Sequence, residues 1–385
     1  MIKIRIRHVD NEIDVQFPIS ENLLYAKLAE IHAIEGRIAP NSAFVTQVYW
    51  PEEFSMLADR FANLDELNYL ARRMESFDVL EMDQFLIAVS KTKSHTEKDL
   101  INLTFNLDKF TLVQDISNMG KIGRAYVMNT EGSVPAHDED DPKYAAIGKD
   151  LIDRRLAEIT ERGLLIRNPF DELREVYDGQ TFPEYYDRAD YLVAVKAEYN
   201  GRSETLFLPD EELAIAKAFR RLQVPSDSEC TVSITDATFD NDEWMERIQQ
   251  IIDKEGIYEA NKMAQAVNTA DMDLAKLSAV VELTGVESAA NIAFLAERID
   301  YFNFIPGATC EDDVGQFLVD NMSCYSMNVE MEEFFDFTAF GEHIAEENGG
   351  KFVAGGFVYY DGDGDLEELL EGLESEDEGM NMGGM

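Results

Sequence analysis

The chain begins with a strong alternation of apolar and polar residues. Residues 2–18 and residues 191–209 both alternate in this way, and each is divided at its centre by a turn pair, Asp10-Asn11 or Asn200-Gly201. A period of two is typical of a half-buried strand, and Asn-Gly between two such runs is a strong hairpin signal. Each segment therefore predicts a β-hairpin. A helical run and another strand follow each hairpin, so both regions are expected to be small α+β units.

The middle of each half is expected to be helical. Apolar residues recur at three- and four-residue steps from Phe54 to Met74, which favours one continuous apolar helix face. Trp244, Ile248 and Ile251 have the same spacing and begin the matching helix of the second half.

The third segments of the two halves agree most closely. Residues 108–129 align with residues 300–321 without a gap, and a further block aligns in the same order at an offset of 193 residues. Colinear matches at a nearly constant offset predict a tandem duplication. The alternative is two unrelated α+β domains that share ordinary helix and strand patterns. The alignment superposes two pairs of structural glycines, Gly123 with Gly315 and Gly148 with Gly341. We expect Gly123 and Gly315 to serve tight helix packing or a turn.

The expected fold class is α+β, as an elongated tandem duplication in which each copy has three small modules. Each copy has a β-hairpin/helix unit, a mostly helical unit and a second α+β unit. The expected boundaries are 1–50, 51–98 and 99–167 for copy one, 168–189 for a linker, 190–240, 241–284 and 285–365 for copy two, and 366–385 for an acidic tail whose composition predicts disorder.

Composition narrows the function. The chain has 77 Asp and Glu against 33 Lys and Arg, a net charge of −44. This charge excludes nucleic-acid binding through a general basic face, and it argues against binding to anionic membrane surfaces. The 45% hydrophobic and 10% aromatic content indicates a folded chain. Residues 1–190 hold 35 acids and 22 bases, and residues 191–385 hold 42 and 11. The second half therefore carries most of the excess negative charge.

Three interpretations of the charge remain open. One is adaptation to high salt, because acidic self-repulsion is a halophile device. Another is a solvated surface without a specific role. The last is imitation of a polyanion, because −44 equals the charge of about 22 base pairs of DNA.

Signals for catalysis, metals and membranes are weak. The three cysteines form no Cys-x-x-Cys pair, and no apolar run approaches the ~18 residues of a spanning helix. Residues 361–372 resemble a calcium loop at three ligand positions, but Leu366 and Gly372 replace the required Gly and Glu. No phosphate loop, nucleophile elbow or kinase set is present. We therefore expect a cytoplasmic protein that is not an enzyme and has no cofactor or metal.

One stretch of the second copy resembles a known family. In order along the chain it carries an acidic pair (312–313), Val-Gly-Gln-Phe-Leu (314–318), Phe-Asp-Phe-Thr-Ala-Phe-Gly (335–341) and a glycine-rich strand start (355–357). This series is similar to the carboxyl-terminal part of the ArdA antirestriction proteins. The first copy resembles the same pattern more loosely.

The resemblance implies an elongated, three-module mimic of bent duplex DNA that occupies the DNA-binding groove of type I restriction–modification enzymes. Members of the family are dimers, so two joined copies imply either a single-chain pseudo-dimer or a homodimer. In the first copy, Met119 and Lys121 lie near the positions where the family has acids.

We therefore predict an inhibitor from a mobile genetic element or phage, whose partner is a DNA-binding defence complex with a basic groove in a bacterial host cell. Its carboxylates would replace phosphates against Lys and Arg. Alternatives are a CRISPR effector or other DNA-binding complex as the target, an acidic scaffold or chaperone for basic proteins, and a carboxylate- or calcium-dependent enzyme. The acids expected to imitate phosphates are Asp300, Glu311, Asp312, Asp313, Asp320, Glu330, Glu332, Glu333, Asp336, Glu342, Glu346, Glu347, Asp240, Asp242, Glu243, Asp138, Glu139, Asp140 and Asp141.

Overall fold

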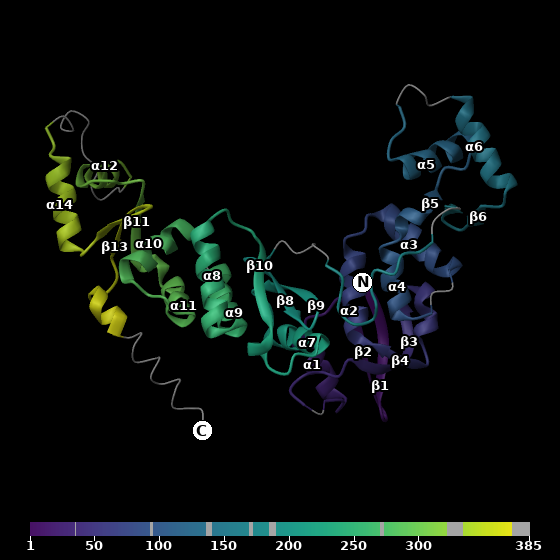
Figure 1. The fold of residues 1–385 in the computed structure, drawn as a ribbon, viewed down its shortest axis with the longest axis horizontal. Helices are drawn as coiled ribbons and strands as arrows, with labels where there is room; N and C mark the ends of the chain where they lie inside the picture. Colours follow the sequence, from purple (N-terminus) through teal and green to yellow (C-terminus); the bar gives the residue numbers. More distant parts are fainter. Residues whose placement is uncertain are drawn as a thin grey trace. The chain divides into compact units, whose positions relative to one another are not determined.

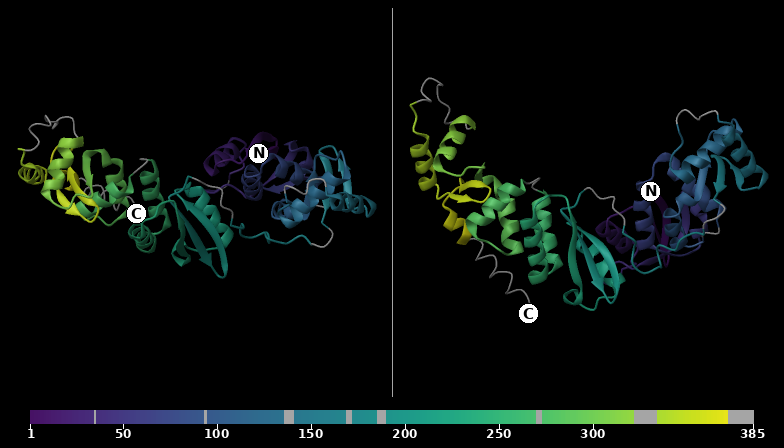
Figure 2. Two further views of the ribbon diagram at one scale, coloured as in Figure 1. Left: turned by 90° about the horizontal axis from the view of Figure 1, so that it is seen from above. Right: turned by 45° about the horizontal axis from the view of Figure 1, so that its top comes forward.

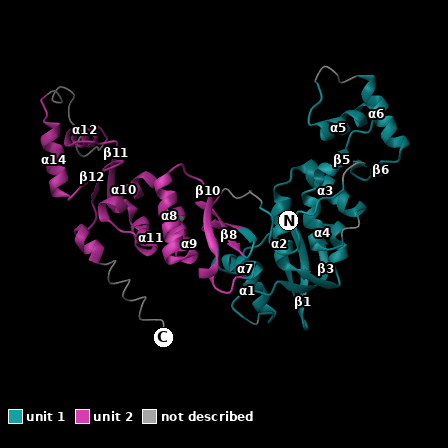
Figure 3. Cartoon of the chain, viewed as in Figure 1, with its two compact units in different colours: residues 1–189, 200–204, 211–223 teal, residues 190–199, 205–210, 224–385 magenta. Residues whose placement is uncertain are grey.

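The protein is a mixed α+β chain that divides into two compact units (Figures 1 and 3). The α+β class expected from the sequence is confirmed. Unit 1 comprises residues 1–189, 200–204 and 211–223, and unit 2 comprises residues 190–199, 205–210 and 224–385. The computed structural model describes residues 1–34, 36–92, 95–135, 141–168, 172–184, 190–269, 273–321 and 334–371.

Unit 1 begins with a four-stranded sheet in the order β2-β1-β3-β4. The first hairpin pairs Ile2 with Phe17 and closes at His8 opposite Asn11, as the alternation predicted. Ile2, Ile4 and Ile6 are buried because period-two side chains share one face of a strand. The elements are β1 (Ile2–His8), β2 (Asn11–Phe17), α1 (Glu21–Glu30), β3 (Ser42–Trp50) and β4 (Arg60–Asn63).

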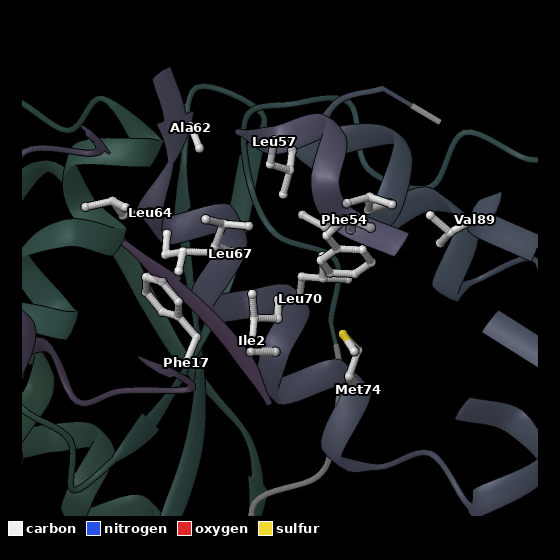
Figure 4. Close-up of a cluster of buried hydrophobic side chains, with 14 of the residues drawn as sticks. Ile2, Phe17, Phe54, Leu57, Ala62, Leu64, Leu67, Leu70, Met74 and Val89 are labelled. Carbon is white, nitrogen blue, oxygen red and sulfur yellow. The ribbon is translucent and has the colours of Figure 1, made fainter. Parts of the chain in front are cut away.

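The continuous helix expected from Phe54 to Met74 is wrong. The segment divides into η1 (Glu52–Leu57), strand β4 and α2 (Leu64–Glu75), and Asp59 between the first two has a left-handed φ of 59°. One core with Ile2 and Phe17 nevertheless receives apolar residues from all three elements: Phe54, Leu57, Ala62, Leu64, Leu67, Leu70 and Met74 (Figure 4). Phe61 of β4 is 67% exposed and stays outside it. Apart from Phe61, the residues at helical spacing therefore share a core but not a helix. Asn63 ends the strand and caps α2, because its side chain accepts from the amides of Asp65 and Glu66.

In the described part of residues 76–168, unit 1 also contains four α-helices, a short 3-10 helix and a three-stranded sheet. The sheet order is β5-β7-β6, and α5 and α6 lie between β5 and β6 in the sequence. The elements are α3 (Val79–Lys91), α4 (Glu97–Thr104), η2 (Leu107–Lys109), β5 (Phe110–Val113), α5 (Met119–Glu131), α6 (Pro142–Asp153), β6 (Ala157–Thr160) and β7 (Gly163–Arg167).

The second predicted hairpin forms β8 and β9, which are neighbours in a sheet of order β10-β8-β9. Helix α7, which follows this hairpin, belongs to unit 1. Residues 242–297 of unit 2 form a cluster of four helices, green in Figure 2. The elements are β8 (Val193–Tyr199), β9 (Arg202–Leu208), α7 (Glu212–Leu222), η4 (Asp227–Glu229), β10 (Thr231–Ala237), α8 (Asp242–Glu255), α9 (Ile257–Thr269), α10 (Leu274–Thr284) and α11 (Ala289–Glu297).

The last sheet of unit 2 has the order β11-β13-β12. It repeats the order of β5-β7-β6, and among the described residues α12 and α14 lie between β11 and β12 in the sequence. Residues 366–371 are helical, and the rest of the predicted tail lies outside the described residues. The elements are η5 (Ile299–Tyr301), β11 (Phe302–Pro306), α12 (Glu311–Asn321), α14 (Phe337–Glu347), β12 (Lys351–Val353) and β13 (Gly356–Tyr360).

A second arrangement that occurs twice is an asparagine side chain bonded to both the backbone N–H and the carbonyl oxygen of one residue, which we call an asparagine clasp. The side-chain amide of Asn68 accepts from the N–H of Ile19 and donates to its carbonyl oxygen, at 2.9 Å each. The amide of Asn261 makes the same two bonds to Asp210, at 2.8 Å each. In both cases a helix is tied to the segment that follows a hairpin.

Across the described ranges, no single helix has the length and apolar content to cross a membrane. The bent pair α10 and α11 meets the length and composition test together, with 120° between the helices. Leu277 and Ile292 of this pair are fully buried in the protein.

Candidate functional site

Helices α12 and α14 cross at two glycines, with their first turns side by side. A Cβ on Gly315 would lie 2.1 Å from the carbonyl oxygen of Phe337, and one on Gly341 would lie 1.9 Å from that of Glu311. Both atoms are backbone, so no side-chain movement could make room. Only glycine permits this approach. Of the two roles expected for Gly315, helix packing or a turn, this contact corresponds to helix packing.

The equivalent crossing joins α5 and α6. A Cβ on Gly123 would lie 1.9 Å from the carbonyl oxygen of Tyr144, and one on Gly148 would lie 2.1 Å from that of Met119. The two crossings therefore share their geometry as well as their place in the sheet order.

The α12–α14 crossing brings several of the predicted acids together, and some of them also support the helices. Asp312 accepts a 3.1 Å hydrogen bond from the hydroxyl of Thr338 on the other helix. Asp336 caps α14 through the amide of Ala339 at 3.0 Å. Asp313 accepts from both the amide and the hydroxyl of Thr309, at 2.8 Å each, and these bonds lower the pKa of its carboxyl.

Of the other predicted acids among the described residues of this region, Glu311 is half-buried and the rest face solvent. Asp300, Asp320, Glu342 and Glu346 are exposed, and none of them forms an ion pair with Lys or Arg within the described ranges. Glu347 contacts His343 at 3.3 Å. The described part of residues 300–371 contains fifteen acids and one basic residue, Lys351, a balance of −14.

The crossing in unit 1 has a different charge. Helices α5 and α6 hold four Lys and Arg against three acids, whereas α12 and α14 hold seven acids and no Lys or Arg. Lys121 pairs with Asp115 at 2.5 Å, and Lys143 pairs with Asp141 at 3.2 Å. Asp141 also caps α6, and the backbone hydrogen bond from Lys143 lowers its pKa. The same fold is therefore nearly neutral in one unit and strongly acidic in the other.

Other predicted acids lie elsewhere. Asp240, Asp242 and Glu243 are exposed at the start of α8, where Glu243 lies 3.6 Å from Arg247. They are therefore on a different helix from the α12–α14 acids. The remaining six predicted acids lie outside the described residues: Asp138, Glu139, Asp140, Glu330, Glu332 and Glu333.

A buried charge cluster in unit 1 was not predicted. Lys217 is 1% exposed, and its Nζ lies 2.6 Å from Oε2 of Glu21 and 2.6 Å from Oδ1 of Asp65. Arg221 bridges Asp65 at 3.4 Å and Glu204 at 2.5 Å. The signal available in the sequence was a lysine inside the apolar run Ala-Ile-Ala-Lys-Ala-Phe.

The described residues contain no group of three or more His, Cys, Asp or Glu side chains arranged to hold a metal ion. Neither a scan against protein-family models nor a search of curated proteins finds a match to the sequence. The function is therefore argued from the residues of the site themselves.

Proposed function

We propose that this protein is an acidic mimic of duplex DNA that inhibits a DNA-binding defence enzyme, with a type I restriction–modification complex as the first target to test. The observation that carries the proposal is the α12–α14 surface. Seven acids and no Lys or Arg occupy two helices that backbone contacts at Gly315 and Gly341 hold together.

In the free protein, the acids of this surface repel one another. Two like charges about 7 Å apart repel by roughly 0.6 kcal/mol even at the dielectric constant of water. A surface of unpaired acids therefore lowers stability unless a partner compensates for it. A groove lined by Lys and Arg, which evolved to hold phosphates, supplies such compensation and speeds encounter by electrostatic steering.

We also infer that the chain is a tandem duplication. The matching sheet orders, the two glycine crossings and the two asparagine clasps support this inference. Because the α5–α6 surface is nearly neutral, the mimicry is assigned to the second copy. The duplication leaves both a pseudo-dimer and a homodimer open, and the mass in solution distinguishes them.

Two variants of equal net charge test the proposal. The first neutralises four exposed acids of the site: Asp312→Asn, Asp320→Asn, Glu342→Gln and Glu346→Gln. The matched control neutralises four exposed acids of unit 1: Asp10→Asn, Glu12→Gln, Glu30→Gln and Glu131→Gln. Binding to a purified type I methyltransferase core would be measured by calorimetry or surface plasmon resonance.

We expect the site variant to lose at least about tenfold in affinity, or about 1.4 kcal/mol, and the control to stay within about twofold. Equal losses in both variants would mean that bulk charge alone drives binding, which favours an acidic scaffold over a mimic. No binding by the folded wild-type chain would move the target to a CRISPR effector or another defence nuclease.

A further inference from the structure

Residues 172–184, which we call the strap, follow β7 and pack on helices of unit 1 without forming a helix or strand. Asn102 on α4 holds the backbone of the strap. Its Nδ2 donates to the carbonyl oxygen of Tyr177 at 2.8 Å, and its Oδ1 accepts from the amides of Val176 and Tyr177 at 2.6 and 2.8 Å. Asn106 makes a similar pair of bonds to Arg174, at 2.9 and 2.8 Å.

Two side chains of the strap, Tyr177 and Phe182, pack on unit 1. Tyr177 is 2% exposed, whereas the strap residues on either side of it are exposed. Phe182, which is half-buried, stacks on Tyr69 with 4.5 Å between ring centroids, and the guanidinium of Arg221 lies 4.8 Å from the same ring. A segment with so few buried groups opens at a lower cost than the core beneath it.

The hydroxyl of Tyr177 donates to Oε1 of Glu66 at 3.2 Å, inside unit 1. Glu66 is 9% exposed, and its other hydrogen bond comes from Nδ2 of Asn63 at 3.0 Å. The covered carboxyl therefore depends on the strap for one of its two hydrogen bonds.

The charged groups around Glu66 do not offset its charge. Asp65 precedes it on α2, and Glu97 of α4 lies nearby with Arg60 as its own partner at 2.7 Å. Lys217 and Arg221 of α7 already pair with Asp65. Burial first, and repulsion from Glu97 second, raise the pKa of Glu66 from 4.5 to about 7.

We propose that the strap is a latch that loss of the Glu66 proton releases. When the strap is docked, the carboxyl is covered and favours its neutral form. When the strap lifts, water reaches the carboxyl and stabilises its charge. A group that holds its proton more tightly in the docked state favours docking at low pH, and that advantage is lost as the pH rises through the docked pKa. This device is independent of the function proposed above.

Hydrogen–deuterium exchange on the full chain tests the latch. The readout is the peptide that carries the amides of Val176 and Tyr177, with rates corrected for the intrinsic effect of pH. For a carboxyl that titrates near 4.5 when exposed and about 7 when covered, the opening constant should rise about 70-fold between pH 5 and pH 8. The peptide covering α3 should keep its protection, because the core of unit 1 stays folded.

Two variants assign the effect to Glu66. Glu66→Gln keeps an acceptor for Tyr177 but cannot ionise, so the strap should stay protected at every pH. Glu172→Gln, at an exposed strap position, should behave as wild type. If Glu66→Gln does not fold, Tyr177→Phe provides the second test, because loss of the donor should move the midpoint to higher pH.

The proposal would be overturned by strap exchange that does not change with pH in the wild type. It would also be overturned by a pH dependence that survives in Glu66→Gln, by a midpoint that Tyr177→Phe leaves unchanged, or by equal changes in the α3 peptide.

Discussion

Replacement of Lys217 by Met should strongly destabilise unit 1. The lysine is 1% exposed and sits between two carboxylates at 2.6 Å each. Methionine has a similar length and removes the charge with little change in volume. The variant therefore leaves two buried carboxylates without their main cation.

The magnitude follows from what remains in the cluster. Asp65 keeps Arg221 at 3.4 Å, and Glu21 keeps the side-chain amide of Asn68 at 3.3 Å. Breaking one partner of a buried ion pair costs about 3–5 kcal/mol, because the charges left behind are uncompensated. Replacing the whole group by neutral residues costs far less. The triple variant Lys217→Met, Glu21→Gln and Asp65→Asn should therefore recover most of the loss.

Urea unfolding provides the assay. The two tryptophans, Trp50 and Trp244, lie in different units, so a Trp244→Phe background makes fluorescence report on unit 1. The midpoint should fall while the slope stays constant. The control is Lys91→Met, which removes a surface ion pair with Glu158 and should cost less than about 1 kcal/mol. A Lys217→Met loss no larger than that of the control, or a triple variant no more stable than the single one, would refute this reasoning.

Two other predictions concern the site. Gly341→Ala should lower the unfolding free energy of unit 2 by at least about 1–3 kcal/mol, because its Cβ would lie 1.9 Å from a carbonyl oxygen. The control Gly355→Ala, whose Cβ would have ordinary contacts at 3.5 Å, should change that free energy little. Chemical denaturation followed through Trp244 measures both. Affinity for the partner should fall between 0.1 and 1 M NaCl, because the screening length shortens from ~10 to ~3 Å, and a titration that is flat across this range would contradict charge-driven binding.

The sequence predicted the local structure well where one physical signal was sufficient. Period-two alternation around a turn pair located both hairpins, because buried and more exposed side chains alternate along β1. In β8 the alternation is weaker, since Val193, Ala194 and Val195 are all buried. The superposed glycines predicted either helix packing or a turn, and the structure has two helix crossings there, because a close backbone approach tolerates no Cβ. The same reasoning failed between Phe54 and Met74. There, the residues at helical spacing lie on a 3-10 turn, a strand and a helix, and Phe61 of the strand is exposed while the others reach one core.

Polar contacts between residues far apart in the chain could not be predicted from the sequence. Nothing local to Lys217 reveals that its carboxylate partners lie about 150 and 200 residues earlier in the chain. Residues 168–189, which carry two prolines, were predicted to be a linker, yet Asn102 and Asn106 bind the backbone of the strap within this segment. The acids of α12 and α14 were predicted from the uneven charge distribution and the family resemblance, and their arrangement depended on the crossing. Asp313 and Asp336 additionally proved to stabilise the helix starts.

The most direct test of DNA mimicry is a competition with duplex DNA. A purified type I methyltransferase core would be bound to a labelled duplex that contains its recognition site, and the protein would be titrated into the complex. The account predicts stoichiometric release of the duplex by the wild type. The variant with four neutralised acids on α12 and α14 should need a higher protein concentration to release the same fraction of the duplex. A ternary complex that retains the duplex would contradict the account, because a mimic and the DNA it imitates cannot occupy one groove together.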